Sequence, residues 1–333
     1  MLKHKILPQK SMDFVAMGRI NVDLYPNEMN APFDQIISFK KSVGGSPANI
    51  ALGTARLGVK TGFIGKVSGD QLGAFILGFF TKEKIDISQI KIDDTGAMNC
   101  LALTEVKNPK DCSAIIYRDN VADLNLKPDE ISEEYVRNAK ILLISGTALS
   151  KSPSREAVYT ALDYANRHNT ATFLDFDYRD KAWSTPDEAS FHYQKAAEKC
   201  DVLIGTKEEI DILNRVNNDI TNDDALTAKE WLRKRAELVI IKYGEDGSIA
   251  YAKDGTIVKG VVFPAKVQKT YGAGDAYASA LVFGILHGWD LSKYLEYAAA
   301  SAAIVISRNA CGESSPTEKE IMDYIEQSMQ VKL

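Results

Sequence analysis

The sequence predicts an α/β fold in which helices cover both faces of a mostly parallel β-sheet. Short, continuously apolar runs recur along most of the 333 residues, and helical patterns separate them. Runs of this length are typical of strands that are buried on both faces. The alternation of strands and helices indicates a doubly wound sheet. The runs lie at residues 14–18, 61–65, 141–145, 171–175, 202–205 and 238–242.

The stretch 153–168 is the clearest of the intervening helices. Its apolar residues recur every three or four positions, which places them on one stripe of a helix. These residues are Ala157, Val158, Ala161, Leu162 and Ala165. Because ligands of doubly wound sheets bind beyond the carboxyl ends of the strands, we expect a site where loops follow the strands.

Two segments interrupt the alternation and divide the chain. Residues 23–43 and 97–121 are β-rich and contain polar turns, so we predict that they form a small β-structured insertion. Residues 248–263 predict a late hairpin that turns at Asp254 and Gly255. The predicted α/β core comprises residues 10–22, 44–96 and 122–333.

Composition excludes several classes of protein. The formal net charge is −5 and the basic residues are scattered, which argues against a nucleic-acid-binding protein. The longest small-apolar run, residues 298–306, is too short to span a membrane, and the N-terminus shows no secretory signal. The four cysteines have neither metal nor redox spacing, so we expect a protein of the reducing cytoplasm.

The run from Gly272 to Asp275 is the strongest functional signal. Gly272, Ala273 and Gly274 lead into Asp275 and an apolar helical pattern. Such a turn presents backbone N–H groups at a helix N-terminus, where anions bind. A carboxylate in the first helical turn of an anion site indicates a base that touches a phosphoryl acceptor. The alternative is an ordinary glycine-rich turn in which the helix dipole favours an aspartate.

A second glycine-rich turn precedes the helical pattern at residues 50–57. Gly44 and Gly45 allow close approach of the backbone to a ligand, and Asn49 offers an amide that donates to and accepts from sugar hydroxyls. Ser46 is the expected N-cap and Pro47 the first helical residue. The alternative is a capped helix after a loop. Two such turns far apart in sequence are a more specific signal of a ligand site than either turn alone.

These two turns resemble the signatures of the ribokinase-like, or PfkB, family of carbohydrate kinases. Residues 44–73 look like the N-terminal signature, residues 269–282 look like the C-terminal one, and the likeness extends over about residues 14–316. The resemblance implies a ribokinase-like fold in which residues 23–43 and 97–121 form a β-sheet lid over the sugar. It also implies a homo-oligomer that pairs through this lid.

The resemblance implies an ATP-dependent transfer of phosphate to a sugar hydroxyl. Asp275 would be the general base, and the N–H groups of Gly272, Ala273 and Gly274 would stabilise the transferred group. Asp23, after the first strand, would bind sugar hydroxyls, unless it is a simple strand-end residue. The residues expected to complete this sugar cradle are Gly44, Gly45 and Asn49.

Two arginines indicate an acid sugar, since guanidinium groups suit carboxylates. Arg118 lies in the expected lid and Arg179 follows a strand. The alternative is that they are surface or ion-paired arginines, with Asp177 or Asp180 as a partner; Asp177 is also a candidate substrate-binding residue. Residues 117–124 and 145–158 look like the branch of the family that phosphorylates the C6 hydroxyl of 5-dehydro-2-deoxygluconate in inositol catabolism. The arginine segments also resemble 2-keto-3-deoxygluconate kinases.

The nucleotide side shows departures from the family pattern. Thr206 stands where the family's Asn-x-x-Glu motif has Asn, and Glu209 would organise Mg²⁺ through water. Lys242, Gly244 and Gly247 resemble the turn on the ATP side. Lys242 stands where Thr is common, and it either binds a phosphate or is an exposed strand-end lysine.

Lys269 stands where many family members have an Asp that helps to bind a monovalent cation. We expect its ammonium to replace that cation, so that K⁺ is not required. Among other classes, a non-catalytic sugar or nucleotide sensor is a remote alternative because Asp275, Glu209 and both turns are present. The sequence fits a dinucleotide-binding dehydrogenase even less well, because it lacks the spaced-glycine fingerprint after a first strand.

Overall fold

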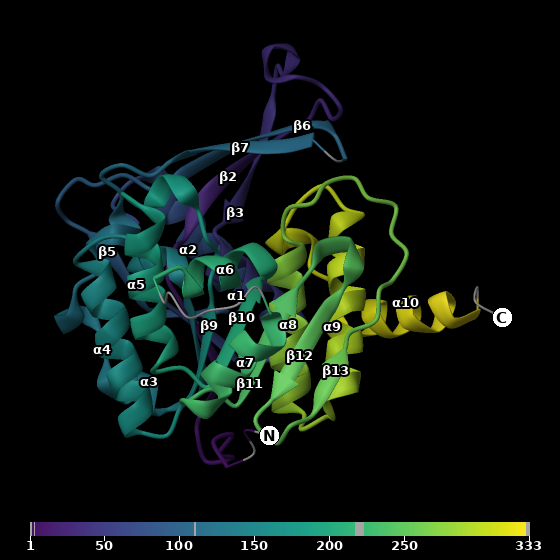
Figure 1. The fold of residues 1–333 in the computed structure, drawn as a ribbon. Helices are drawn as coiled ribbons and strands as arrows, with labels where there is room; N and C mark the ends of the chain where they lie inside the picture. Colours follow the sequence, from purple (N-terminus) through teal and green to yellow (C-terminus); the bar gives the residue numbers. More distant parts are fainter. Residues whose placement is uncertain (1, 3, 110, 217–222, 331–333) are drawn as a thin grey trace.

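A computed structural model describes residue 2 and residues 4–109, 111–216 and 223–330 of the chain. The described residues form one large sheet flanked by helices and one small sheet above it (Figure 1). The N-terminal part of the chain begins below the large sheet, and the last helix projects from its side. The α/β prediction is confirmed.

The large sheet has nine strands among the described residues. In spatial order the strands are β13 (Ile257–Lys259), β12 (Ser248–Ala252), β11 (Leu238–Lys242), β10 (Val202–Thr206), β9 (Ala171–Asp175), β8 (Ala139–Ser145), β1 (Met12–Met17), β4 (Thr61–Ser68) and β5 (Asp86–Asp93). Neighbouring strands from β11 to β5 are parallel, and β12 and β13 form an antiparallel edge. The hairpin predicted for residues 248–263 corresponds to this edge.

The side chains of the central strands divide between two hydrophobic cores. In β1, Phe14 and Ala16 lie in one core and Val15 and Met17 in the other, as the two-residue period of a strand requires. Helices on both faces bury these residues, which explains why the strands are apolar without interruption.

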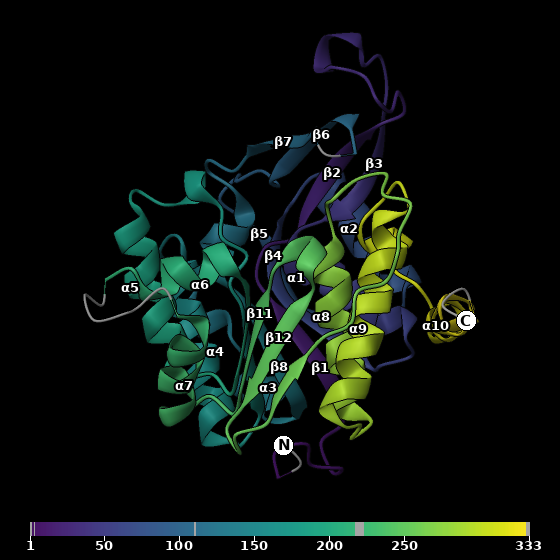
Figure 2. The same ribbon diagram turned by 45° about the vertical axis from the view of Figure 1, so that its right-hand side comes forward.

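The helices that cover one face come from the two ends of the chain, and those on the other face come from its middle (Figure 2). The first group is α1 (Ser46–Arg56), α2 (Gln71–Lys82), α8 (Ala273–Leu286), α9 (Leu291–Ile306) and α10 (Glu318–Gln330). The second group is α3 (Glu133–Arg137), α4 (Ser154–Arg167), α5 (Pro186–Ala197), α6 (Lys207–Asn214) and α7 (Asp224–Arg233).

Short 3₁₀ helices occur mainly in the connections between these elements. They are η1 (Phe33–Gln35), η2 (Ala122–Asn125), η3 (Pro128–Glu130), η4 (Gly146–Leu149), η5 (Asp180–Ala182), η6 (Gly244–Asp246) and η7 (Gly312–Ser314). No helix among the described residues is both long enough and apolar enough to cross a membrane.

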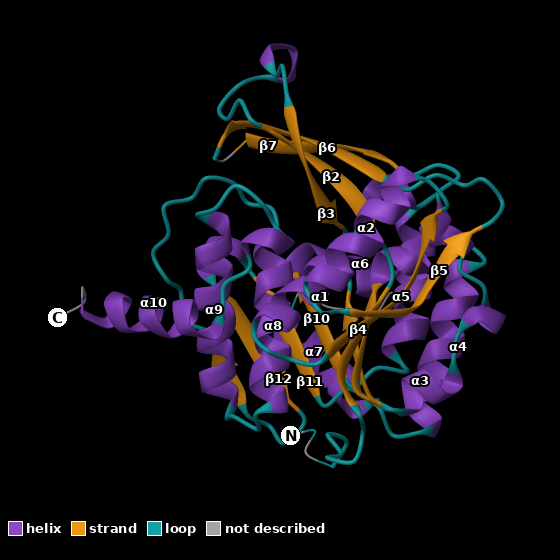
Figure 3. Ribbon diagram, turned by 180° about the vertical axis from the view of Figure 1, so that it is seen from behind, coloured by secondary structure: helices purple, strands orange, loops and turns teal. Residues whose placement is uncertain are grey.

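The small sheet stands above one end of the large sheet (Figure 3). Its order is β3 (Phe39–Gly44), β2 (Asn21–Pro26), β6 (Leu101–Asn108) and β7 (Asp111–Tyr117). Strands β2 and β6 are parallel and the other pairs are antiparallel. We call this sheet the lid. Its first strand begins at Asn21, two residues before the segment predicted for the insertion, so β2 continues almost directly from the end of β1.

Candidate active site

A cavity of about 770 Å³ lies between the lid and the carboxyl ends of the large sheet's strands. It receives residues from the ends of β9, β10 and β11, from the lid and from the start of α8. The predicted site residues that line it are Asp23, Gly45, Asn49, Arg118, Asp177, Arg179, Thr206, Glu209, Lys242, Gly272, Gly274 and Asp275.

Four predicted residues do not line this cavity. Gly44 lies behind Asp23, and Ala273 is the first residue of α8. Gly244 and Gly247 form the turn of η6 between β11 and β12, where Gly247 has a φ of 88°.

The turn before α8 has the backbone geometry of an anion site. Gly272 is the N-cap with a φ of 79°, and a Cβ there would lie 2.9 Å from Cys311 Sγ, so only glycine fits. The N–H groups of a helix's first turn have no partners within the helix. A Cβ added to Gly274 would lie 3.2 Å from Lys242 Nζ, which places this ammonium beside the turn.

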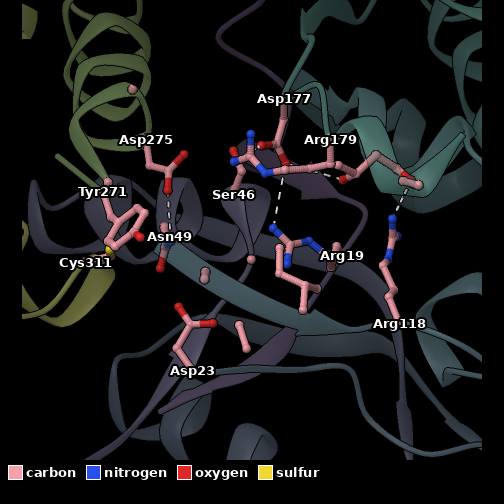
Figure 4. Close-up of a pocket in the computed structure, with 18 of the residues that line it drawn as sticks. Arg19, Asp23, Ser46, Asn49, Arg118, Asp177, Arg179, Tyr271, Asp275 and Cys311 are labelled. Carbon is pink, nitrogen blue, oxygen red and sulfur yellow. Dashed lines mark hydrogen bonds and ion pairs between the residues drawn. The ribbon is translucent and has the colours of Figure 1, made fainter. Parts of the chain in front are cut away.

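Asp275 is the third residue of α8 and is held by the other glycine-rich turn. Its Oδ2 accepts a hydrogen bond from Asn49 Nδ2 at 2.8 Å, across 226 positions of sequence (Figure 4). Asn49 Oδ1 in turn accepts from the N–H of Gly312 at 3.1 Å, which fixes the orientation of the amide. Burial, and next the negative charge of Asp177, raise the pKa of Asp275. This carboxylate is therefore fixed in position and more basic than an ordinary aspartate.

A row of buried polar residues crosses the floor of the lid. Arg19 Nη1 donates to Asn21 Oδ1 at 3.1 Å, and Asn21 Nδ2 donates to Asp23 Oδ1 at 2.6 Å. Tyr25 Oη donates to the other oxygen of Asp23 at 3.0 Å. Burial raises the pKa of Asp23, although Arg19 and these hydrogen bonds oppose the rise.

The sequence prediction included only Asp23 from this row. Arg19, Asn21 and Tyr25 were missed, although polar and apolar residues alternate without exception from Arg19 to Tyr25. Such alternation indicates one strand face that carries the polar groups.

The two glycines before α1 accommodate this polar row. A Cβ on Gly44 would lie 2.1 Å from Asp23 Cγ, and one on Gly45 would lie 2.4 Å from the carbonyl oxygen of Arg19. Gly45, with a φ of 99°, is the N-cap of α1. The prediction of Ser46 as N-cap is therefore wrong: Ser46 is the first helical residue, and its hydroxyl donates to Asp175 Oδ2 at 3.2 Å.

Arg118 and Arg179 both line the cavity and both form ion pairs. Arg118 Nη2 lies 2.6 Å from Asp123 Oδ2, and its Nη1 donates to the carbonyl of Thr147 at 3.0 Å. Arg179 Nη2 lies 2.5 Å from Asp177 Oδ1. Both arginines are thus ion-paired, as the alternative interpretation of the sequence predicted, and Asp177 is the partner of Arg179. Figure 4 places a further arginine, Arg19, below Asp177.

Thr206 and Glu209 form a capping box at the start of α6. Glu209 Oε2 accepts from the N–H of Thr206 at 2.7 Å, and Thr206 Oγ1 accepts from the N–H of Glu209 at 3.3 Å. The other oxygen of Glu209 accepts from the N–H of Tyr178 at 2.9 Å. The threonine that departs from the family motif therefore serves as a helix N-cap.

Lys242 points into the cavity. Its side chain is 14% exposed and Nζ lies 3.7 Å from Asp175 Oδ1, so the prediction of an exposed strand-end lysine is wrong. Burial alone would lower the pKa of Lys242, but the neighbouring carboxylates, Asp175 first, raise it. Burial raises the pKa of Asp175 to about 7, against the opposing effect of Lys242.

Lys269 is completely buried beneath the turn that precedes α8. Its Nζ donates to the carbonyl oxygen of Tyr271 at 2.7 Å and to that of Val305 at 3.5 Å, and Cys311 Sγ lies 3.9 Å away. Burial lowers the pKa of Lys269. Carbonyl oxygens are typical ligands of monovalent cations, and here they receive an ammonium.

The raised pKa of Asp275 predicts that its buried carboxylate lowers the stability of the folded protein near neutral pH. A carboxyl whose folded pKa exceeds its unfolded value of 3.8 destabilises the fold as pH rises between the two values. We expect Asp275→Asn to raise the Tm by about 2 °C or more at pH 8, which corresponds to about 1 kcal/mol. The gain should shrink toward pH 4.

Thermal unfolding at several pH values measures this effect. The control is Asp119→Asn, because the side chain of Asp119 is fully exposed and its pair with Lys151 is 3.8 Å long. A Tm of Asp275→Asn that equals or falls below the wild-type value at pH 8 would contradict the role of burial.

Comparison with known proteins places the chain in a family. Residues 12–318 match the family described as pfkB family carbohydrate kinase. The 5-dehydro-2-deoxygluconokinase of Geobacillus kaustophilus is 51% identical over 319 residues, which are 96% of this chain and 95% of that protein.

Solved structures share the fold. A fructokinase from Xylella fastidiosa with bound ATP has a TM-score of 0.84 at 20% identity, over 95% of this chain and 99% of that chain. An uncharacterized sugar kinase from Pyrococcus horikoshii in complex with ATP has a TM-score of 0.79 at 26% identity, over 95% of this chain and 99% of that one. The expectation of a ribokinase-like fold is confirmed, and the chain belongs to the pfkB family of carbohydrate kinases.

Proposed function

We propose that this protein transfers the γ-phosphate of ATP to the C6 hydroxyl of 5-dehydro-2-deoxy-D-gluconate. The 51% identity to the 5-dehydro-2-deoxygluconokinase of Geobacillus kaustophilus supports this substrate. The sugar kinases of the same fold with bound ATP support ATP as the phosphate donor. The observation that carries the reaction is the position of Asp275. It lies in the first turn of α8, whose backbone N–H groups have no partners within the helix, and inside a cavity lined by arginines.

Asp275 is proposed as the general base. Its Oδ2 is held by Asn49, and the carboxylate would accept the proton of the C6 hydroxyl as the oxygen attacks phosphorus. A raised pKa suits this role because it makes the carboxylate a better proton acceptor near neutral pH. Asn49 is then a positioning residue that keeps the carboxylate directed toward the cavity.

The turn at Gly272, Ala273 and Gly274 is proposed to bind the transferred phosphoryl group. Its N–H groups would stabilise the negative charge on the phosphoryl oxygens, and the small residues permit close approach. Lys242, next to Gly274, adds a positive charge at the same place. Thr206, Gly244 and Gly247 are proposed to flank the nucleotide.

Glu209 is the residue that we propose holds hydrated Mg²⁺. Among the described residues no three His, Cys, Asp or Glu are grouped as ligands for a metal ion. Each oxygen of Glu209 accepts one backbone N–H and keeps a further lone pair for a metal-bound water. Bound Mg²⁺ would neutralise charge on the phosphates.

The sugar is proposed to lie between the lid and α8. Asp23, Gly45 and Asn49 would surround its hydroxyls, and Arg118 and Arg179 would provide positive charge for its carboxylate. We also propose that two copies pair through the lid, because Tyr117 on the edge strand β7 is 59% exposed and Ile115 is 47% exposed. We also propose that the protein acts in the reducing cytoplasm, because its cysteines are free.

An ADP-release assay over a panel of sugars tests the function. We expect the highest kcat/KM with 5-dehydro-2-deoxygluconate, a lower one with 2-keto-3-deoxygluconate and the lowest with fructose. Asp275→Asn should lower kcat by about 10³-fold or more while the Kd of ATP stays within about twofold, because the base does not contact ATP in the ground state. Preference for fructose would overturn the acid-sugar assignment, and full activity of Asp275→Asn would overturn the base.

Gly44→Ala tests the position of Asp23. The added Cβ would lie 2.1 Å from Asp23 Cγ, and this short, buried side chain cannot move without losing its bonds to Asn21 and Tyr25. We expect the KM for the sugar to rise about tenfold or more, with little change in the KM for ATP. Gly78→Ala is the matched control, because a Cβ there meets nothing within 4 Å. Equal behaviour of the two variants would contradict the role of Asp23.

Lys269 is proposed to make the enzyme independent of K⁺. Its ammonium already donates hydrogen bonds to the carbonyl oxygens of Tyr271 and Val305. We expect kcat to change less than twofold when tetramethylammonium replaces K⁺ in the assay. Lys269→Ala should lose activity and regain part of it on addition of K⁺. Strong stimulation of the wild type by K⁺ would refute this proposal.

A further inference from the structure

We propose that Arg19 recognises the carboxylate of the substrate and so determines the preference for acid sugars. This inference rests on the proposed function and names the residue that sets its substrate class. Arg19 follows β1 and lines the cavity with a side chain that is only 7% exposed. A guanidinium so deeply buried is costly unless its donors and its charge are satisfied.

The donors of Arg19 are used less than those of the two other arginines in the cavity. Among the described residues, its only hydrogen bond to an oxygen runs from Nη1 to Asn21 Oδ1. Its nearest carboxylate oxygen, Oδ2 of Asp177, is 3.9 Å from Nη2, which is beyond hydrogen-bond distance. That oxygen already lies within 3.4 Å of the hydroxyls of Ser145 and Thr147.

The other two arginines have closer partners. Arg118 places Nη2 at 2.6 Å from Asp123 and uses Nη1 on the carbonyl of Thr147. Arg179 places Nη2 at 2.5 Å from Asp177, and its Nη1 donates to the carbonyl of Tyr178 at 2.8 Å. Arg19 is therefore the arginine of this set with the most donor capacity left for a ligand.

A single carboxylate would complete the surroundings of Arg19. The carboxylates that face it are Asp177, Asp23 and Asp123, the cation that faces it is Arg179, and the Cys100 thiol lies against it. Asp123 is already paired with Arg118, Asp177 is shared with Arg179, and Asp23 is bonded to Asn21 and Tyr25. A substrate carboxylate accepting from the Arg19 guanidinium gains charge-assisted bonds without displacing any of these pairs.

The backbone holds Arg19 where such a ligand would reach it. Gly45 approaches the carbonyl of Arg19 so closely that a Cβ would lie 2.4 Å away, which locks this residue against α1. Asp177, between Arg19 and Arg179, has a φ of 40°. Strained backbone at a non-glycine residue is typical of functional sites. In Figure 4 the Arg19 guanidinium points toward Asp177, within the same cavity as Asp275.

The test compares the acid substrate with its uncharged primary amide. The wild type should use 5-dehydro-2-deoxygluconate at least about 100-fold better in kcat/KM than the amide, since charged hydrogen bonds are the strong ones. Arg19→Met should reduce this ratio to below about fivefold through the KM for the acid. Arg19→Lys keeps the charge without the planar fork, and it should give an intermediate ratio.

Arg118→Met is the competing variant, because Arg118 is another proposed source of positive charge for the carboxylate, although its Nη1 and Nη2 are already bonded to Thr147 and Asp123. It should reduce the acid-over-amide ratio less than Arg19→Met does. Equal losses on acid and amide in Arg19→Met would show that Arg19 only positions Asn21 and Asp23, and would overturn the proposal. An unchanged ratio, or a ratio lost in Arg118→Met alone, would overturn it as well. A wild type that phosphorylates no acid sugar would instead refute the proposed function.

Discussion

The hydrogen bond between Asn49 and Asp275 joins the two halves of the site. It links the first turn of α1 to the first turn of α8, and so it aligns the glycine-rich turn at the lid with the glycine-rich turn at the anion site. Helices α1 and α8 approach closely enough for this bond because Gly53 of α1 faces Ser279 of α8. A Cβ on Gly53 would lie 2.3 Å from the serine Oγ. Close packing of two helices thus places the proposed base, from one end of the chain, against the proposed sugar site, from the other.

Buried charge is the second constraint on the site, because many buried carboxylates and cations line the cavity. Carboxylates and cations alternate across the strand ends, from Asp175 and Lys242 to Asp177 and Arg179. Such groups are held in place by pairing, because an unpaired buried charge is strongly unfavourable. The arrangement favours rigid, preoriented side chains over stability, and the raised pKa of Asp275 is one sign of it. Binding of an anionic sugar and ATP would add charges that this arrangement is suited to accept.

Lysine stands at two positions where the resemblance to the family predicts another residue, and the surroundings of the two lysines differ. Lys242 lies beside the anion turn at the end of a strand, with a carboxylate for support. Lys269 lies underneath the same turn and donates to main-chain carbonyls. The two ammonium groups therefore approach the same loop from different sides. Lys242 lines the cavity, and Lys269 forms hydrogen bonds within the protein.

The sequence predicted the class of fold and the two glycine-rich turns, because apolar runs, helical stripes and glycine clusters are local signals. It predicted the central strands and Asp275 on a first helical turn, but it missed the edge strand β5, whose residues mix charged and apolar side chains. Most of the pairs among the charged side chains were not predicted, because they form between residues that meet only in the folded chain. Arg19, Asn21 and Tyr25 belong to the site because the lid folds over the sheet. Lys242, at the end of β11, lies 3.7 Å from Asp175, which ends β9 on the far side of β10, and this pair holds the lysine in the cavity. Pairings between distant residues depend on packing, which no local pattern encodes.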